Sequence, residues 1–412
     1  MKKEIIRLTE EAEALCRNRF QEIDGIAFSN TERVLEAFRN HRVSEACFGG
    51  TTGYGYDDLG RETLDQIYAD LLGTESALVR IGFVNGTHAL TSALFALAAP
   101  GEHLLSVTGL PYDTLQEALG IRGNAFGSLG FYGIGYEQVD LDADGNPDYT
   151  AIAEAVCHPG TAAVLIQRSR GYASRRALSV EEIGEIVKVV RKATPGVLVM
   201  VDNCYGEFTQ AIEPGHVGTE LIAGSLIKNP GGGLAPAGGY VAGRKELVER
   251  AAQRLTTPGI GGECGATLGN NRLLFQGLFL APHIVAQALK TAVFCAAMMQ
   301  RIGIPSFPGV EDPRSDIIQT VCLGSGDRMK RFCRGIQKGS PVDSFVTPEP
   351  WAMPGYDDPV IMAAGAFVQG SSIELSADGP LREPYQVYLQ GGLTYEAGKL
   401  GIMMAVEEMM NT

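Results

Sequence analysis

LIAGSLIKNPGGGLAPAGGYVAG, residues 221–243, is the stretch around which the rest of the chain is organised. Lys228 follows an apolar run and precedes a glycine-rich segment, so its ammonium does not belong to an ordinary charged surface. Because burial disfavours the charged form of an amine, we expect a lowered pKa and a nucleophilic amine at this position. Ser225 can reach the same ligand, and the glycines at 231–233 can let the backbone approach it closely. A lone lysine at a strand end is more often solvated, so the assignment depends on the rest of the chain.

Short apolar runs and amphipathic segments alternate in the residues before this stretch. Continuous apolar runs at 162–167 and 197–201 predict strands buried on both faces. Between them, Ser179 and Glu182 have the spacing of a capping box that opens an amphipathic helix. A strand, helix and strand in this order predict an α/β fold with a mostly parallel sheet layered with helices.

The chain is long enough for one large domain and a smaller one. We expect an N-terminal helical arm over residues 1–50, a large domain over 51–285 and a small C-terminal α/β domain over 286–412. The longest apolar stretch, 277–299, is interrupted by polar and charged residues, which predicts a core helix rather than a membrane span.

Composition excludes several classes of protein. The formal net charge is −14 over 412 residues with no Lys/Arg run, so a nucleic-acid partner is not expected. The eight cysteines form no C-x-x-C pair and the six histidines form no H-E-x-x-H motif, so we expect no dedicated metal site. The N-terminus reads as an amphipathic helix and not as a targeting segment, so we expect a cytoplasmic protein without a membrane partner.

Polar residues follow the predicted strands at the edge where open parallel sheets bind ligands. Asp202 ends the strand at 197–201, and Lys228 follows another strand candidate. Upstream, Gly86 and Thr87 open a predicted helix, whose free N–H groups and positive dipole end suit a phosphate. An acid, a lysine and a phosphate-binding helix start together predict a pyridoxal 5′-phosphate (PLP) site.

Each residue type has a physical role in such a site. The lysine amine forms an internal aldimine and later moves protons. Asp202 favours a protonated pyridine ring, which is a better electron sink. Ser225 supplies a further phosphate ligand, and Tyr112 is the candidate for stacking on the ring, although a packing role is equally open. Arg170, just past the strand at 162–167, is a candidate ligand-binding residue.

Three motifs carry a family resemblance: NGTHAL (85–90), VDNCYGEF (201–208) and GSLIKNPGG (224–232). At these residues the chain resembles the fold-type-I PLP enzymes of the cystathionine lyase and methionine γ-lyase group, in the branch described as aluminium-resistance proteins. The resemblance implies a fold-type-I PLP-dependent transferase fold. It also implies a homodimer or homotetramer in which loops of one subunit complete the active site of another.

The resemblance also assigns residues outside these motifs. GYGYDDLGR (53–61) lies where relatives carry a Tyr-x-Arg that reaches the partner's phosphate; Tyr54 or Tyr56 can supply the tyrosine, but the arginine is not reproduced. In relatives a C-terminal arginine binds the substrate carboxylate, and Arg382 is the candidate here.

The reaction predicted from this resemblance is elimination of a thiol from a sulfur-containing amino acid, as in cystathionine β-lyase or methionine γ-lyase. Because the cofactor apparatus specifies the electron sink and not the bond broken, an aminotransferase is the alternative with the same cofactor. A non-catalytic protein that binds a hard cation such as aluminium is the alternative from another class, although scattered carboxylates do not make an oxygen-ligand cage.

Overall fold

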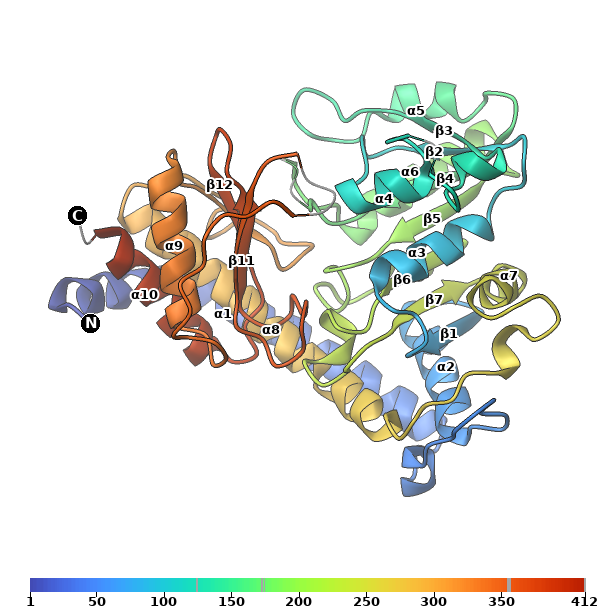
Figure 1. Cartoon of the computed structure of the whole chain (residues 1–412), viewed down its shortest axis with the longest axis horizontal. Helices are drawn as coiled ribbons and strands as arrows, with labels where there is room; N and C mark the ends of the chain where they lie inside the picture. Colours follow the sequence, from blue (N-terminus) through green and yellow to red (C-terminus); the bar gives the residue numbers. More distant parts are fainter. Residues whose placement is uncertain (124, 172, 174, 354–356, 411–412) are drawn as a thin grey trace.

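The computed structural model describes all residues except 124, 172, 174, 354–356 and 411–412. Figure 1 shows a large lobe built on one sheet, a smaller lobe built on a second sheet, and two long helices, α1 and α8, that run beneath both. The described helices are α1 (Lys3–Asn40), α2 (Leu59–Leu72), α3 (Gly86–Phe95), α4 (Asp113–Leu119), α5 (Tyr149–Ala155), α6 (Val180–Ala193), α7 (Lys245–Leu255), α8 (Asn271–Arg301), α9 (Gly326–Lys338) and α10 (Tyr395–Met410). The described strands are β1 (Ser76–Arg80), β2 (His103–Ser106), β3 (Gly135–Gln138), β4 (Thr161–Gln167), β5 (Leu198–Asp202), β6 (Leu221–Ser225), β7 (Gly239–Gly243), β8 (Ser306–Phe307), β9 (Gln319–Cys322), β10 (Val360–Ala364), β11 (Ser376–Pro380) and β12 (Gln386–Gln390).

The sheet of the large lobe has seven strands in the order β1-β7-β6-β5-β4-β2-β3. Strands β6, β5, β4, β2 and β3 are parallel, whereas β7 runs antiparallel to both β6 and β1. The predicted α/β fold with a mostly parallel sheet is therefore confirmed. The β4 and β5 strands lie side by side at the centre, so the loops that follow them meet at one edge of the sheet.

Helices cover both faces of this sheet, which explains its continuous apolar strands. In β4, Ala163 and Leu165 pack toward α3 and α4, whereas Val164 and Ile166 pack toward α5 and α6. A strand buried on both faces needs apolar residues at every position rather than at alternate ones. The α6 helix begins with the predicted capping box, in which the Ser179 side chain accepts from the Glu182 amide and the Glu182 side chain accepts in return.

The smaller lobe is an antiparallel sheet in the order β10-β11-β12-β9-β8, with α9 packed against β10 and β11 and α10 packed against α9. The chain reaches this lobe along α8, which lies beside α1, and an ion pair of 2.6 Å joins Lys290 to Asp24. Because α8 begins under the large sheet and ends under the small one, the predicted boundary at 285/286 falls inside a helix (Figure 1).

Among the described residues, α8 is the one helix long and apolar enough to cross a membrane. About two thirds of its most apolar window, 67%, is buried inside the protein, where it packs against α1 and α10. This burial agrees with the core helix predicted over 277–299.

Candidate active site

A cavity of about 490 Å³ opens between the two lobes, at the carboxyl end of the parallel strands. The large lobe contributes Asp202, Ser225 and Lys228, and the small lobe contributes Ser372 and Tyr388. Asp202 is the last residue of β5, and Lys228 comes three residues after the end of β6. Since β5 and β6 are adjacent and parallel, the acid and the lysine meet at the edge predicted from the sequence.

Lys228 lies between β6 and a short helical turn, Asn229–Gly231, that fixes its backbone. Its Nζ atom lies 4.1 Å from the centroid of the Tyr205 ring, within the range of a cation–π contact. The Tyr205 backbone adopts a left-handed conformation with φ of 70°, and its hydroxyl accepts a hydrogen bond from Ser372 Oγ at 3.2 Å. Tyr205 was not singled out from the sequence, although it lies within the VDNCYGEF motif.

Acidic groups around Lys228 hold its pKa well above the usual range. Burial by itself lowers the pKa of the amine, but Cys204, Tyr205 and Asp202 favour the ammonium and outweigh burial. The lowered pKa expected from the sequence is therefore wrong, because that expectation considered burial without the acids brought in by the end of β5. As an ammonium, the Lys228 side chain must lose a proton before its amine can act as a nucleophile.

Asp202 is nearly buried, and burial raises the pKa of its carboxyl although the neighbouring Lys228 ammonium opposes that shift. The carboxylate is held by a hydrogen bond of 3.1 Å from the Cys204 amide to its Oδ1 atom. A buried carboxylate at the wall of a cavity favours a cation placed against it. That property suits the ring nitrogen of PLP.

The start of α3 forms a second part of the cavity, where Gly86 and Thr87 lie beside Ser225. Ser225 Oγ is buried and has no hydrogen-bond partner among the described residues. A Cβ atom at Gly86 would lie 3.0 Å from Ser225 Cβ, so a side chain there would push Ser225 away and narrow this space. Free helix N–H groups beside an unpaired hydroxyl suit a phosphate, so these residues fit the phosphate group of PLP.

Tyr112 lines the same cavity, and its hydroxyl lies 3.3 Å from Thr87 Oγ1. Burial raises the pKa of Tyr112, and the carboxylate of Asp202 adds to this shift, so the phenol stays protonated at neutral pH. The structure thus brings together Lys228, Asp202, Tyr112 and the three predicted phosphate ligands.

The two predicted substrate-binding arginines do not line this cavity. Arg382 is exposed, and its Nη1 atom donates to Asp358 at 3.0 Å. Arg170 is buried behind the cavity wall, where its Nε atom lies 3.6 Å from Asp316 and its Nη1 atom lies 3.4 Å from Thr320 Oγ1. In the described part of the chain, Lys228 is the only basic side chain that lines the cavity.

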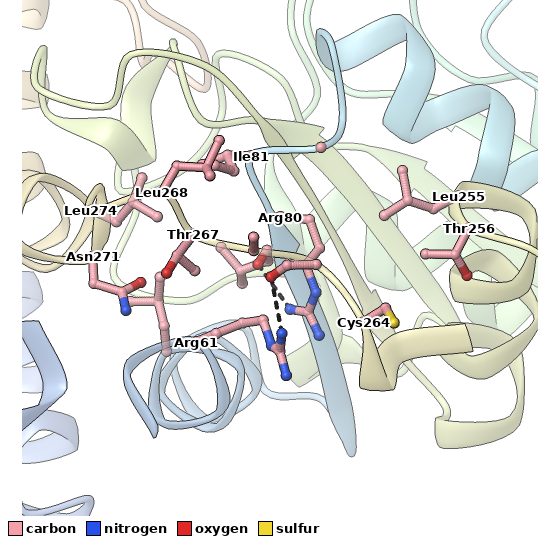
Figure 2. Close-up of a pocket in the computed structure, with 15 residues that line it drawn as sticks. Arg61, Arg80, Ile81, Leu255, Thr256, Cys264, Thr267, Leu268, Asn271 and Leu274 are labelled. Atoms are coloured by element: carbon pink, nitrogen blue, oxygen red, sulfur yellow. Dashed lines mark hydrogen bonds between the residues drawn. The ribbon is translucent and has the colours of Figure 1, made fainter. Parts of the chain in front are cut away.

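Tyr54 and Tyr56 lie outside the cavity of their own subunit. Both are exposed, and their rings stack with centroids 5.6 Å apart. Their loop is held by Arg61, whose Nη1 atom donates to the carbonyl oxygens of Gly55 and, at 2.9 Å, Gly265. Figure 2 shows Arg61 in a separate cavity of about 300 Å³ beside this loop. The arginine of this stretch therefore anchors the loop.

The glycines at 231–233 do not form a wall of the ligand cavity. Gly231 and Gly232 pack against α8 instead, and a Cβ atom at Gly232 would lie 2.2 Å from the carbonyl oxygen of Gly277. The expectation that they let backbone approach the ligand is wrong, because the segment turns down onto α8 immediately after Lys228.

A family model described as methionine gamma-lyase matches residues 5–410. The chain belongs to the methionine gamma-lyase family. It is 50% identical over 402 residues to the uncharacterized protein YnbB of Bacillus subtilis (strain 168), covering 97% of this chain and 95% of that protein. It is 51% identical to a carbon-sulfur lyase involved in aluminium resistance from Clostridium novyi NT, whose crystal structure matches with a TM-score of 0.95 over 98% of this chain and 96% of the other.

A more distant structure shares the fold. The pyridoxal-5′-phosphate dependent protein YhfS from Escherichia coli is 18% identical, with a TM-score of 0.62 over 95% of this chain and 97% of the other. Membership of the methionine gamma-lyase family confirms the predicted class, a carbon–sulfur lyase that uses PLP. The fold-type-I PLP-dependent fold predicted from the sequence is confirmed as well.

Proposed function

We propose that this enzyme eliminates a thiol from a sulfur-containing amino acid, with cystathionine and methionine as the first substrates to test. The observation that carries the proposal is the juxtaposition of Lys228, Asp202 and the unpaired Ser225 hydroxyl in one cavity of a methionine gamma-lyase family member. When PLP is bound, it withdraws electrons from the α-carbon of an amino acid attached to it.

The residues of this chain have separable roles in that reaction. Lys228 would hold the cofactor through Nζ, and its amine, once the amino group of the substrate has released it, would accept the proton of the substrate α-carbon. The Asp202 carboxylate holds a proton on the ring nitrogen by opposite charge. Gly86 and Thr87 amides with the Ser225 hydroxyl bind the phosphate.

The aromatic side chains of the cavity act by packing and by excluding water. Tyr112 lines the cavity and would pack against the ring of the cofactor, where it would take up space that water would otherwise fill. Tyr205 lies next to Lys228, with its ring centroid 4.1 Å from Nζ. A dry site strengthens every charge interaction within it.

Arg382 remains the residue that we predict to bind the substrate carboxylate. Arg382 does not line the cavity, but its ion pair with Asp358 is exposed and contributes at most about 1 kcal/mol, so the side chain can leave that pair to meet a substrate carboxylate. Arg170 already forms an ion pair with Asp316, and we propose a different role for it in the next subsection.

Borohydride reduction of the yellow holoenzyme, followed by peptide mapping, tests the assignment of Lys228. The pyridoxyl group is expected on Lys228 alone, because it is the only basic side chain lining the cavity in the described part of the chain. Lys228→Arg, which keeps the charge, should take no label. A label on another lysine would overturn the assignment.

Product analysis separates elimination from transamination. With cystathionine, methionine, homocysteine and cysteine in turn, elimination yields a keto acid, ammonia and a thiol in equal amounts. Keto acid without ammonia or thiol, together with conversion of the cofactor to pyridoxamine phosphate, would replace the lyase proposal with an aminotransferase.

The hard-cation alternative is tested separately by titrating the purified protein with aluminium. Among the described residues there is no group of three or more His, Cys, Asp or Glu side chains placed to hold a metal ion. Stoichiometric tight binding of the cation by a protein without lyase activity would favour this alternative.

We further propose a cytoplasmic homodimer or homotetramer with active sites shared between subunits. The support is the exposed Tyr54–Tyr56 stack, which does not line the cavity of its own chain. We also propose the three-part organisation into residues 1–50, 51–285 and 286–412, with α8 as the rigid link between the last two.

A further inference from the structure

A second cavity, of about 900 Å³, lies behind the wall of the active site. Ser169 and Gly171 line the active-site cavity, whereas Arg170 between them lines this second one. Five arginines and three acids line it, an excess of positive charge in a chain whose formal net charge is −14. We call it the arginine cavity, and its charged lining residues are Arg19, Arg170, Arg175, Arg176, Arg314, Glu181, Glu182 and Asp312.

Three of the five arginines have a carboxylate partner. Arg176 forms an ion pair with Glu182, and Arg19 pairs with an acid on its own helix, α1. Arg170 lies 3.6 Å from the buried Asp316. Their charges are balanced within the protein, although the Nε atoms of Arg19 and Arg170 have no hydrogen-bond partner among the described residues.

Arg314 has no carboxylate within ion-pair distance among the described residues, yet its side chain is only 5% exposed. Its Nη2 atom donates to neutral oxygens, the carbonyls of Pro308 and Gly309 and, at 2.7 Å, the side chain of Gln319. Its Nη1 and Nε atoms have no hydrogen-bond partner in the same part of the chain. Burial, with the nearby Arg170 charge, lowers the pKa of this guanidinium to about 9.

Arg175 is in a similar position. It donates to the backbone carbonyls of Arg176, Gln167 and Ser169, and no carboxylate of the described chain pairs with it. Burial lowers its pKa to about 10. A buried charge without an opposite charge is costly unless a ligand or solvent compensates it, so the buried Arg314 guanidinium, with the half-buried Arg175 beside it, favours an anion in this cavity.

We propose that the arginine cavity binds a small-molecule oxyanion, with a phosphate or carboxylate group held by Arg314 together with Arg19 and Arg170. A guanidinium presents paired N–H donors that match the oxygens of either group. Arg314 lines this cavity together with Arg19 and Arg170, so the three guanidiniums surround the space that such a ligand would occupy. The site is distinct from the phosphate cradle at Gly86, which belongs to the active-site cavity.

The two cavities share a wall, so a ligand in one contacts the segments that shape the other. Asp316 Oδ2 accepts hydrogen bonds from Ser169 Oγ at 3.0 Å and from the Arg170 amide at 3.2 Å. On β12, Gln386 lines the arginine cavity and Tyr388, two residues further and on the same face, lines the active site. This proposal does not depend on which bond the enzyme breaks.

Calorimetric titration of the holoenzyme tests the proposal with two probes, inorganic phosphate and succinate. Saturation with PLP fills the cradle at Gly86, so binding of added anion reports a second site. We expect one saturable site per chain for at least one probe, with affinity that falls as NaCl is raised because the attraction is between charges. Phosphate alone would assign the site to phosphate-bearing ligands, and succinate alone to carboxylate-bearing ones.

Substitutions of the lining arginines test whether the anion binds within the arginine cavity. Arg314→Gln is expected to weaken binding at least about tenfold, the effect of losing one charged hydrogen-bonding partner. Arg19→Gln provides a second variant if the first does not fold, and Arg328→Gln, an exposed arginine of α9, is the matched control that should bind as the wild type does. Lack of saturable binding by either probe, or unchanged affinity in folded Arg314→Gln or Arg19→Gln holoenzyme, would overturn the proposal.

Discussion

Lys228 and Asp202 act on each other through charge as well as through the cofactor they are proposed to hold. The carboxylate helps to keep the pKa of the amine high, and the ammonium in turn opposes the effect of burial on the pKa of the acid. Each group therefore favours the charged form of the other, and both line the cavity that would hold the cofactor.

Asp202→Asn is expected to keep the cofactor and lose most activity, because an amide does not favour a protonated ring. The loss in kcat/KM should correspond to about 2 to 4 kcal/mol, comparable to the removal of a preorganised charge partner elsewhere. Steady-state kinetics with the absorbance of the bound cofactor as a check on loading measure both effects. Asp140→Asn, an exposed acid beyond β3, is the control, and wild-type turnover in Asp202→Asn would show that another group tunes the ring.

Glu207 is a buried carboxyl near this pair, and burial raises its pKa to about 8 from the usual 4.5. Its Oε1 atom accepts from the Tyr240 hydroxyl at 2.8 Å, and its Oε2 atom has no hydrogen-bond partner among the described residues. Between pH 4.5 and about 8, the Glu207 carboxyl is therefore protonated in the folded protein and ionised in the unfolded chain. Stability must fall as the pH rises through that window.

Glu207→Gln removes this titration while keeping an oxygen for Tyr240. Relative to the variant, the wild-type free energy of unfolding should fall by up to about 1.4 kcal/mol per pH unit as the pH rises through that window. Denaturant unfolding of both proteins at pH 5.5 and 7.5 measures the difference. An offset between the two proteins that stays the same at both pH values would contradict a raised pKa at Glu207.

At the scale of elements, the phosphate cradle depends on how closely α3 approaches the end of β6. Asn85 caps α3 through its side chain, which accepts from the His88 amide, so the helix starts beside Ser225 with its first N–H groups free. A glycine at position 86 permits that approach without a shift of Ser225, because a Cβ atom there would meet Ser225 Cβ at 3.0 Å.

Gly86→Ala should lower the affinity for PLP about tenfold, since the added methyl group narrows the space for the phosphate. Titration of the apoenzyme with PLP, followed by absorbance, gives the dissociation constant. Gly82→Ala is the matched control, because a Cβ atom at that nearby glycine meets nothing within 4 Å. Equal loss of affinity in both variants would mean that glycine acts through backbone flexibility and not through the cradle.

At the scale of the whole molecule, the active site lies between lobes that α1 and α8 hold in place (Figure 1). The cavity lining contains no arginine in the described part of the chain, although the cofactor phosphate and the substrate carboxylate both carry negative charge. A second subunit that brings the Tyr54–Tyr56 loop to this opening would complete the site.

Mixing two inactive variants tests that sharing. Lys228→Ala lacks the reacting amine, and Tyr56→Ala removes a tyrosine that we expect to act in the neighbouring subunit. Subunit exchange at equal concentrations should restore about a quarter of wild-type activity, because half of the dimers are mixed and each of those has one intact site. Mixtures that stay inactive after exchange has been demonstrated by mass spectrometry would place Tyr56 in a packing role.

Sequence patterns alone were enough to predict the alternation of strands and helices, the capping box of α6 and the meeting of Lys228, Asp202 and Gly86 at one cavity, because these are local signals of periodicity, capping and motif spacing. Only the tertiary structure decided what surrounds them. The raised pKa of Lys228 depends on side chains brought from the end of β5, the glycines after it pack on α8, and Arg170 turns away from the ligand toward Asp316. Each of these depends on contacts between segments far apart in the chain, which no local pattern encodes.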